Sequence, residues 1–287
     1  MRTGRQRLPE WLRAKGAAGS ASHGVRAALR AQGLRTVCEE ARCPNAGECF
    51  GSGTAAFLIL GGVCSRRCGF CAVGKGVPGA VDPGEPARLA AQAAAMKLRH
   101  VVITSVTRDD LHDGGAGQFA IAIREVRAAL PGSTIEVLVP DFAGSMDALQ
   151  TVLHERPDVL NHNVETVEDL YAVVRPAAVY GRSLALLKRA ASDGGVVAKS
   201  GLMVGLGEDD GQLRRTFADL ARTGVRMLTI GQYLQPRLTN LPVMKYYHPD
   251  EFAELGRLAR EAGIPDVFSA PLVRSSYHAG EKLAGLL

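Results

Sequence analysis

All six cysteines of the 287-residue chain lie in one short stretch that begins at Cys38 and ends at Cys71. Disulfides in a chain of this length are expected to tie distant segments together, and a reducing compartment keeps thiols free. The crowding therefore favours a metal or cluster site, and the fold must present this stretch as one densely liganded region. The cysteines form two groups of three, the N-terminal triplet (Cys38, Cys43 and Cys49) and the CxxxCxxC triplet (Cys64, Cys68 and Cys71).

After the cysteines, short apolar runs alternate with longer stretches of helical periodicity. This alternation is typical of repeated β/α units around a parallel sheet, and we count about six of them. We therefore predict an α/β fold, a partial TIM barrel, flanked by N- and C-terminal extensions. The expected strands are residues 56–61, 100–105, 134–139, 159–163, 196–204, 226–234 and 267–269. The expected helices are residues 86–96, 117–130, 146–155, 183–191, 212–222 and 251–262.

Composition is that of an ordinary globular protein, with 46% hydrophobic and 22% charged residues. The sequence has no run of eighteen apolar residues and no apolar stretch of a secretion signal at its start. We expect a cytoplasmic protein that binds neither membrane nor nucleic acid. Eight Lys or Arg and one acid among residues 1–36 leave open a transit peptide or nucleic-acid arm. The alternative is a basic extension that lies on the barrel and attracts an acidic partner.

The CxxxCxxC triplet follows the first expected strand directly. A four-iron cluster held by three cysteines keeps one iron open for a small chelating ligand. Zinc is the alternative, although structural zinc sites usually bring CxxC pairs from two knuckles. The spacing, with Phe70 before the last cysteine, resembles the radical S-adenosylmethionine superfamily. The resemblance implies that S-adenosylmethionine binds the open iron and is cleaved by an injected electron to a 5′-deoxyadenosyl radical, which abstracts hydrogen from unactivated carbon.

The N-terminal triplet contains two helix breakers, Pro44 and Gly47, so we predict a loop that folds its sulfurs around one centre. Together with Gly61-Gly62-Val63 and Arg274-Ser275-Ser276-Tyr277, this triplet resembles the lipoyl synthase family. The resemblance implies an auxiliary 4Fe-4S cluster, consumed as the sulfur donor, whose fourth iron is bound by Ser276. Ser275 is the fallback, and an ordinary polar turn is the alternative for both serines. A hard alkoxide ligand should be displaced more easily than a thiolate, which suits a sacrificial cluster.

Polar residues just after the expected strands are the candidate contacts of S-adenosylmethionine. By resemblance, a Gly-Gly segment approaches the methionine amino group, and an arginine pairs with the carboxylate. The predicted contacts are Thr104, Asp113, Gly114, Gly115, Asn163, Glu165, Arg175 and Glu208.

Alternatives remain for several of these segments. Asp109 or Asp113 is expected to cap a helix, and His162 is expected to be a structural hydrogen-bond donor. The glycines before and after Glu208 resemble a dinucleotide fingerprint, but the third, Gly211, lies one place late for GxGxxG. We therefore reject NAD binding.

The family resemblance extends from Leu8 to His278, with Arg237 and Ala270 as departures from the family pattern. It implies insertion of two sulfur atoms into an octanoyl chain attached to a lipoyl carrier domain, on dehydrogenase E2 subunits or the glycine cleavage H protein. Ferredoxin or flavodoxin is the implied electron donor. The resemblance also divides the chain into an arm with the auxiliary-cluster loop (1–52), a radical S-adenosylmethionine (β/α)6 barrel (53–270) and a segment that closes the auxiliary cluster (271–287).

Two other functions are compatible with part of this pattern. A sulfur-inserting enzyme of biotin synthase type would share the CxxxCxxC triplet but should lack the N-terminal triplet and the Arg-Ser-Ser-Tyr string. A non-catalytic electron-transfer protein would hold each cluster with four cysteines, and six cysteines cannot supply eight ligands.

Overall fold

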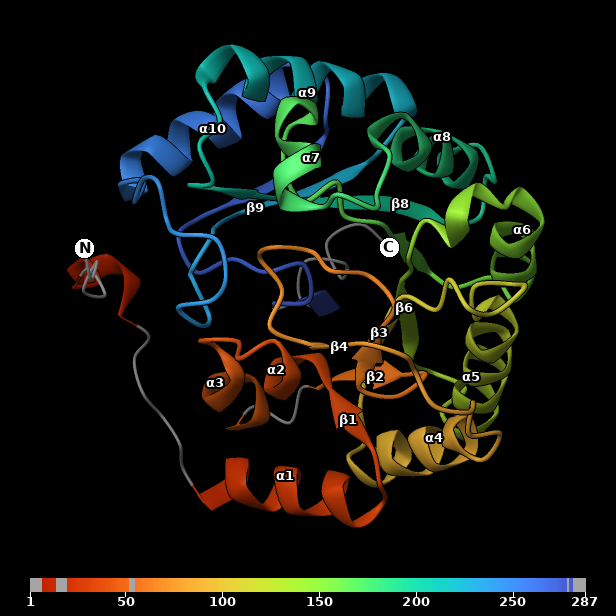
Figure 1. Cartoon of the computed structure of the whole chain (residues 1–287). Coiled ribbons are helices and arrows are strands. Elements are labelled where there is room, and N and C mark those ends of the chain that lie inside the picture. The colour runs from red at the N-terminus through yellow and green to blue at the C-terminus, as the bar shows by residue number, and fades with distance from the viewer. Residues whose placement is uncertain (1–6, 14–19, 52–54, 278, 281–287) are drawn as a thin grey trace.

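A curved, mostly parallel sheet forms the centre of the computed structural model, which describes residues 7–13, 20–51, 55–277 and 279–280 (Figure 1). In this part of the chain the strand order is β1-β2-β5-β6-β7-β8-β9-β10, and only β1 runs antiparallel to its neighbour. The strands are β1 (Arg35–Thr36), β2 (Ala56–Ile59), β5 (His100–Ser105), β6 (Thr134–Leu138), β7 (Val159–Asn161), β8 (Val197–Val204), β9 (Met227–Gln232) and β10 (Asp266–Ser269).

Helices join successive parallel strands and cover the outer face of the sheet (Figure 1). Their apolar sides pack on buried strands such as β2, in which every residue is buried. Helix α9 begins with a capping box, in which Asp209 and Gln212 each accept the other's main-chain N–H. These helices are α4 (Glu85–Ala95), α5 (Ala116–Ala129), α6 (Met146–His154), α8 (Tyr180–Ala191), α9 (Asp210–Thr223) and α10 (Pro249–Glu261).

The predicted partial TIM barrel is thereby confirmed, and every expected strand and helix is present within three residues of its predicted bounds. No helix in the described ranges is long and apolar enough to cross a membrane. The predicted domain boundary between residues 52 and 53 lies outside the described residues. The structure also contains η1 (Glu10–Leu12), α1 (Ser20–Ala31), α2 (Val37–Glu40), α3 (Ala46–Gly51), β3 (Val63–Cys64), β4 (Gly74–Lys75), η2 (Phe142–Gly144), η3 (Glu168–Leu170) and α7 (Tyr171–Val174).

The N-terminal triplet does not form the simple loop that we predicted. Cys38 lies in α2 and Cys49 in α3, with a turn between the two helices. Gly47 lies inside α3, because a helical glycine costs only about 1 kcal/mol, which tertiary contacts outweigh. Pro44 precedes that helix, where a proline removes no helical hydrogen bond. The helix breakers therefore shape the segment without preventing helices.

A buried ion pair crosses the interior of the barrel. Lys199 on β8, 0% exposed, donates to both carboxylate oxygens of Glu136 on β6, 1% exposed, at 2.8 and 2.9 Å. Asn161 donates to the same carboxylate at 3.1 Å, and the His100 ring lies 3.5 Å from it. Burial by itself raises the pKa of Glu136, but Lys199 and His100 lower it to about 2 from an ordinary 4.5.

Lys199→Met should destabilise the protein strongly, because it leaves Glu136 as a buried charge without its cation. Removing one partner of a buried ion pair costs about 3–5 kcal/mol. Arg257→Ala, which removes two exposed ion pairs on α10, is the control and should change the stability little. Urea unfolding measures the difference, and the double variant Glu136→Gln/Lys199→Met should recover much of the loss. An equal effect of Lys199→Met and Arg257→Ala would contradict this expectation.

The stabilisation from Glu136 should also depend on pH. Because the pKa is depressed in the folded state, the stabilisation is fully present above 4.5 and is lost as the pH falls toward 2. The difference in unfolding free energy between wild type and Glu136→Gln should therefore shrink across this window. Unfolding titrations at pH values from 7 down to 3 measure it, and a constant difference would show that the carboxylate is not the source.

Candidate functional site

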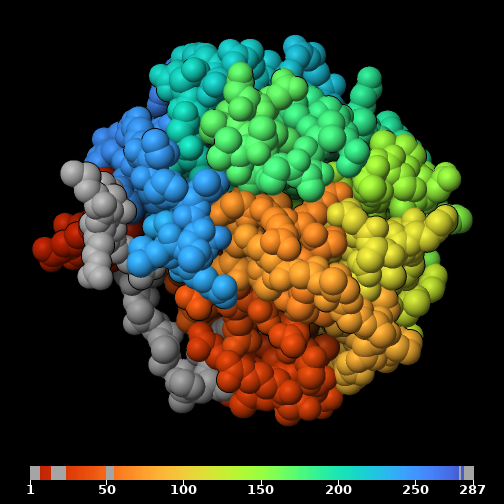
Figure 2. Space-filling view, in the orientation of Figure 1, coloured from red at the N-terminus to blue at the C-terminus, as the bar shows by residue number. Residues whose placement is uncertain are grey.

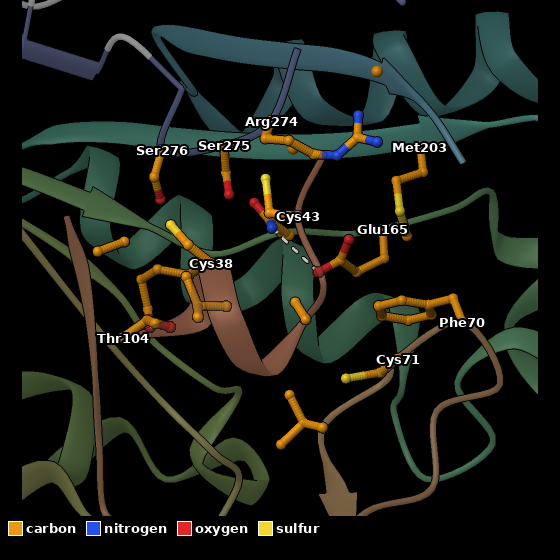
Figure 3. A pocket seen from close by; sticks show the side chains of 18 of the residues that line it. Cys38, Cys43, Phe70, Cys71, Thr104, Glu165, Met203, Arg274, Ser275 and Ser276 are labelled. Atoms are coloured by element: carbon orange, nitrogen blue, oxygen red, sulfur yellow. Dashed lines mark hydrogen bonds between the residues drawn. The ribbon is translucent and has the colours of Figure 1, made fainter. Parts of the chain in front are cut away.

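One cavity of about 360 Å³ opens at the carboxyl ends of the parallel strands, where a β/α barrel carries its chemistry. The ends of β5 to β9, the cysteine segments and the segment after β10 all contribute to its wall. Figure 3 shows side chains from these segments pointing into the same space. The predicted site residues that line it are all six cysteines together with Thr104, Asn163, Glu165, Arg175, Ser275 and Ser276.

Arg66, inside the CxxxCxxC triplet, anchors this segment to two strand ends. The residue is 7% exposed, and its guanidinium donates to both oxygens of Asp109 at 2.8 Å and to Asp141 at 2.6 Å. Asp109 follows β5 and Asp141 follows β6. Charge-assisted hydrogen bonds of this kind are short and strong. One buried guanidinium therefore holds the cysteine segment over the sheet edge.

A second anchor comes from the segment between β9 and α10. Asn240 Nδ2 donates to the carbonyl oxygens of Gly69 and Cys71 at 3.0 Å each, and the Leu241 amide also donates to Gly69. Figure 2 shows the two segments side by side, with the cysteine segment in orange at the centre of the face and its neighbour in light blue. The CxxxCxxC triplet is thus fixed from both sides.

The segment after β10 returns to the N-terminal triplet. The Tyr277 amide donates to the Arg274 carbonyl at 3.1 Å, which closes a turn with Ser275 and Ser276 at its centre. In Figure 3 both serine hydroxyls point toward the side of the cavity where Cys38 and Cys43 are drawn. The placement brings the predicted serines to the predicted cysteines, and the choice between Ser275 and Ser276 stays a prediction.

The Cys38 and Cys71 side chains resist ionisation when no cation is bound. Burial, followed by the neighbouring Cys43 and Cys49, raises the pKa of Cys38 to about 12. Burial also raises the pKa of Cys71 to about 11, and Cys68 contributes to that rise. Metal binding replaces the thiol protons and removes the repulsion among thiolates. A donor set of three soft thiolates matches iron-sulfur iron, so both triplets fit a cluster.

Glu165 has a φ of 66°, a left-handed conformation that is uncommon for a residue other than glycine. Its carboxylate points into the cavity and accepts a hydrogen bond from Asn163 Nδ2 at 3.1 Å (Figure 3). A Cβ on Gly201 of the adjacent strand would lie 2.5 Å from Asn163 Oδ1, so the glycine makes room for this pair. Burial raises the pKa of Glu165, although the nearby Arg175 opposes the rise. Strained polar residues of this kind are concentrated at ligand sites.

Several buried polar atoms at this end of the cavity have no hydrogen-bond partner among the described residues. Arg175 Nη1 donates to the carbonyl oxygens of Asn163 and Val164 at 2.9 and 3.0 Å, whereas its Nε has no acceptor. Asn163 Oδ1 and Ser105 Oγ are also unpaired. Buried polar groups in native proteins are almost always paired, so these atoms fit a polar ligand such as S-adenosylmethionine.

Asp113, Gly114 and Gly115 are predicted contacts that do not line the cavity. The Asp113 carboxylate accepts from the amides of Gly115 and Gly117 at 2.9 and 2.8 Å, so it caps α5, the alternative that we considered. A Cβ on Gly115 would lie 2.3 Å from a methyl group of Leu60, so packing requires the glycine. Their contact with S-adenosylmethionine stays a prediction.

Glu208 is also absent from the cavity wall. Its carboxylate accepts from the amides of Gly205 and Leu206 at 2.5 and 2.9 Å, and so it folds back onto its own turn. Thr104 does line the cavity, but its hydroxyl donates to the Leu138 carbonyl oxygen at 2.9 Å. Their contact with S-adenosylmethionine also stays a prediction.

His162 is a structural residue, as predicted. Its Nδ1 donates to the Val139 carbonyl oxygen at 2.8 Å, and its Nε2 lies 2.9 Å from the Ser183 hydroxyl. Burial and the charge of Arg175 lower its pKa to about 4, which keeps the ring neutral. In the described part of the chain, no three His, Cys, Asp or Glu side chains are grouped to hold a single metal ion.

The sequence analysis missed two anchors of the site, Arg66 and Asn240. A signal for Arg66 was present, because a charged residue between cluster-binding cysteines must find a partner if it is buried. No local pattern marks Asn240, whose acceptors lie about 170 positions earlier in the chain.

Comparisons with solved structures support the fold. Streptococcus suis SuiB bound to S-adenosylmethionine matches with a TM-score of 0.58 at 12% identity, over 78% of this chain and 53% of that one. Methylornithine synthase matches with a TM-score of 0.55 at 15% identity, over 92% of this chain and 86% of the other. At these identities the likeness concerns the fold alone.

Comparisons of sequence show the family. The model of the radical SAM superfamily matches residues 58–220, and that of the N-terminal domain of lipoyl synthase matches residues 1–43. Lipoyl synthase of Rubrobacter xylanophilus is 53% identical over 97% of this chain and 87% of its own length. Lipoyl synthase of Nitratidesulfovibrio vulgaris is 54% identical over 95% of this chain and 91% of its own length. The chain therefore belongs to the lipoyl synthase family of radical S-adenosylmethionine enzymes.

Proposed function

We propose that this chain inserts two sulfur atoms into the octanoyl chain of a lipoyl carrier domain, on dehydrogenase E2 subunits or the glycine cleavage H protein. The observation that carries the proposal is the meeting of both cysteine triplets with the Ser275-Ser276 turn in one cavity. Each C–H bond that is replaced by a C–S bond requires one S-adenosylmethionine and one electron, and ferredoxin or flavodoxin is the proposed donor. The cytoplasm is the proposed compartment.

The residues of the two triplets would hold two 4Fe-4S clusters. Cys64, Cys68 and Cys71 would bind one, and the N-terminal triplet with Ser276 would bind the other. When bound, the first supplies the electron that cleaves S-adenosylmethionine, and the second supplies the sulfur. Arg66 and Asn240 hold the first set of ligands in place from opposite sides, as their hydrogen bonds to the cysteine segment and its neighbours indicate.

The chain's own side chains would bind and orient S-adenosylmethionine beside the CxxxCxxC triplet. Arg175 has a free Nε for the carboxylate, and Glu165 and Asn163 have oxygens for an amino group or ribose hydroxyls. Apolar residues such as Leu202 and Val106 complete the wall and keep water from a reactive radical. S-adenosylmethionine would thus bind at the polar end of the cavity, and the N-terminal triplet at the other end would hold the sulfur donor. This arrangement suits hydrogen abstraction followed by sulfur insertion.

The reaction itself is tested by anaerobic reconstitution with iron and sulfide, followed by incubation with an octanoyl-lysine peptide, dithionite and S-adenosylmethionine. We expect about eight irons per chain and, by mass spectrometry, a product that has gained two sulfurs. Ser276→Ala should still form 5′-deoxyadenosine but should insert no sulfur, whereas Ser275→Ala, the matched control, should keep most of the product. About four irons with no inserted sulfur would remove the proposal, and zinc in place of iron would also exclude radical chemistry.

Arg175→Lys should weaken binding of S-adenosylmethionine by about 10- to 100-fold, because the single ammonium nitrogen of a lysine cannot occupy both the Nη1 position, which bonds the main chain, and the Nε position, which is open to the ligand. Isothermal titration calorimetry of the reconstituted protein measures the affinity. Arg182→Lys, which changes a half-exposed arginine paired with Asp141, is the control and should bind as wild type does. Equal affinity of the Arg175 and Arg182 variants would exclude a role for Arg175 in binding.

A further inference from the structure

We propose that Asn45 is a positioning residue that holds the serine-bearing segment against the N-terminal triplet. Its side chain is buried, 3% exposed, and its Nδ2 donates to the main-chain carbonyl oxygen of Leu272 at 2.7 Å, across 227 positions of sequence. The main-chain carbonyl oxygen of Asn45 accepts from the amide of Cys49 at 3.0 Å. Asn45 therefore contacts a cysteine of the triplet and the base of the serine turn at the same time.

The serine-bearing segment, residues 271–277, is held to β9 at its first residues. The Gln232 amide donates to the Pro271 carbonyl oxygen at 3.1 Å, and a Cβ on Gly231 would lie only 2.1 Å from the Val273 carbonyl oxygen. These contacts position the segment relative to the sheet. They do not position it relative to the triplet, which lies on α2, α3 and the turn between them.

At least two hydrogen bonds among the described residues link this segment to the helices and turn that carry the N-terminal triplet. One is the bond from the Asn45 side chain to Leu272, and the other joins the Tyr277 hydroxyl to the Glu48 carboxylate at 2.9 Å. The Glu48 side chain is exposed, so water competes fully for that bond, whereas the donor of the other bond, Asn45, is buried and is less accessible to water. Asn45 is therefore the stronger of these two links.

This link matters for the chemistry because a serine is a poor ligand for iron-sulfur iron and stays bound only if the protein holds it in place. The inference rests on the proposed function in one respect, since it takes the N-terminal triplet and a serine as ligands of one cluster. Without the Asn45 amide, the serine turn should drift from the triplet, and iron held there should be lost faster.

The chain contains a matched control in Asn240. Its carboxamide also donates to main-chain carbonyl oxygens of a cysteine segment, those of Gly69 and Cys71 at 3.0 Å, but it serves the CxxxCxxC triplet. The two asparagines thus make the same kind of bond to different triplets. Removal of the Asn45 carboxamide should affect only the irons at the N-terminal triplet, and removal of the Asn240 carboxamide should affect only those at the CxxxCxxC triplet.

The experiment uses the full-length chain in two backgrounds, one with Cys64, Cys68 and Cys71 changed to alanine and one with Cys38, Cys43 and Cys49 changed to alanine. Each protein is reconstituted anaerobically and mixed with a ferrous chelator, and iron release is followed by absorbance. In the first background, Asn45→Ala should release iron about tenfold faster than its parent, whereas Asn240→Ala should not. In the second background the two effects should be reversed. Asn45→Asp, which keeps the shape and removes the donor, should behave as Asn45→Ala and replaces it if that variant does not fold.

Release at the parental rate from both Asn45 variants in the first background would overturn the inference. Faster release from Asn45→Ala in both backgrounds would also overturn it, because this result indicates general loosening of the fold. If the first background binds no iron while the second binds about four, the proposed function fails, and the inference fails with it. Iron bound normally in both backgrounds with no effect of Asn45 would leave the proposed function standing and reject only the inference.

Discussion

The crowding of six cysteines around one buried cavity is the constraint on which the arrangement of this protein depends. Six cysteines line one cavity, and burial together with neighbouring sulfurs opposes ionisation of Cys38 and Cys71. Iron binding must displace the thiol protons, and it requires that the protein keep the sulfurs in place. Buried hydrogen bonds do this. Arg66 fixes one triplet to two strand ends, Asn240 fixes it to the segment before α10, and Asn45 joins the other triplet to the serine turn.

The parallel sheet makes these distant contacts possible, because its carboxyl ends meet at one edge. Side chains alternate between the two faces of a strand. A residue two positions earlier than a cavity-lining residue therefore points to the same side and lies in the next layer of the interior. Glu136 and Lys199 occupy that layer, below Leu138 and Gly201. The ion pair thus lies one layer beneath the cavity, whereas the strained Glu165 is held by main-chain hydrogen bonds to Gly201 and Met203 of β8.

Local sequence patterns predicted much of the fold, and the failures have physical causes. Alternation of apolar runs and amphipathic stretches located the β/α units, because strands and helices have different periods. The N-terminal triplet was wrongly predicted as a loop, since tertiary contacts outweighed the unfavourable helix propensity of Gly47. The carboxylates of Asp113 and Glu208 accept hydrogen bonds from main-chain amides and do not face the cavity. Their direction depends on the conformation of the loop, which the spacing of residues in the sequence does not predict.

The sequence by itself determined the donor chemistry, the β/α architecture and the family, because cysteine spacing and hydrophobic periodicity are local properties that a chain carries without being folded. Only the tertiary structure decided which residues hold the ligands in position. Arg66, Asn45 and Asn240 act through partners that lie between 43 and 227 positions away. Such bonds have no sequence period, since they form only where folding brings a buried donor to an unpaired carbonyl or carboxylate oxygen.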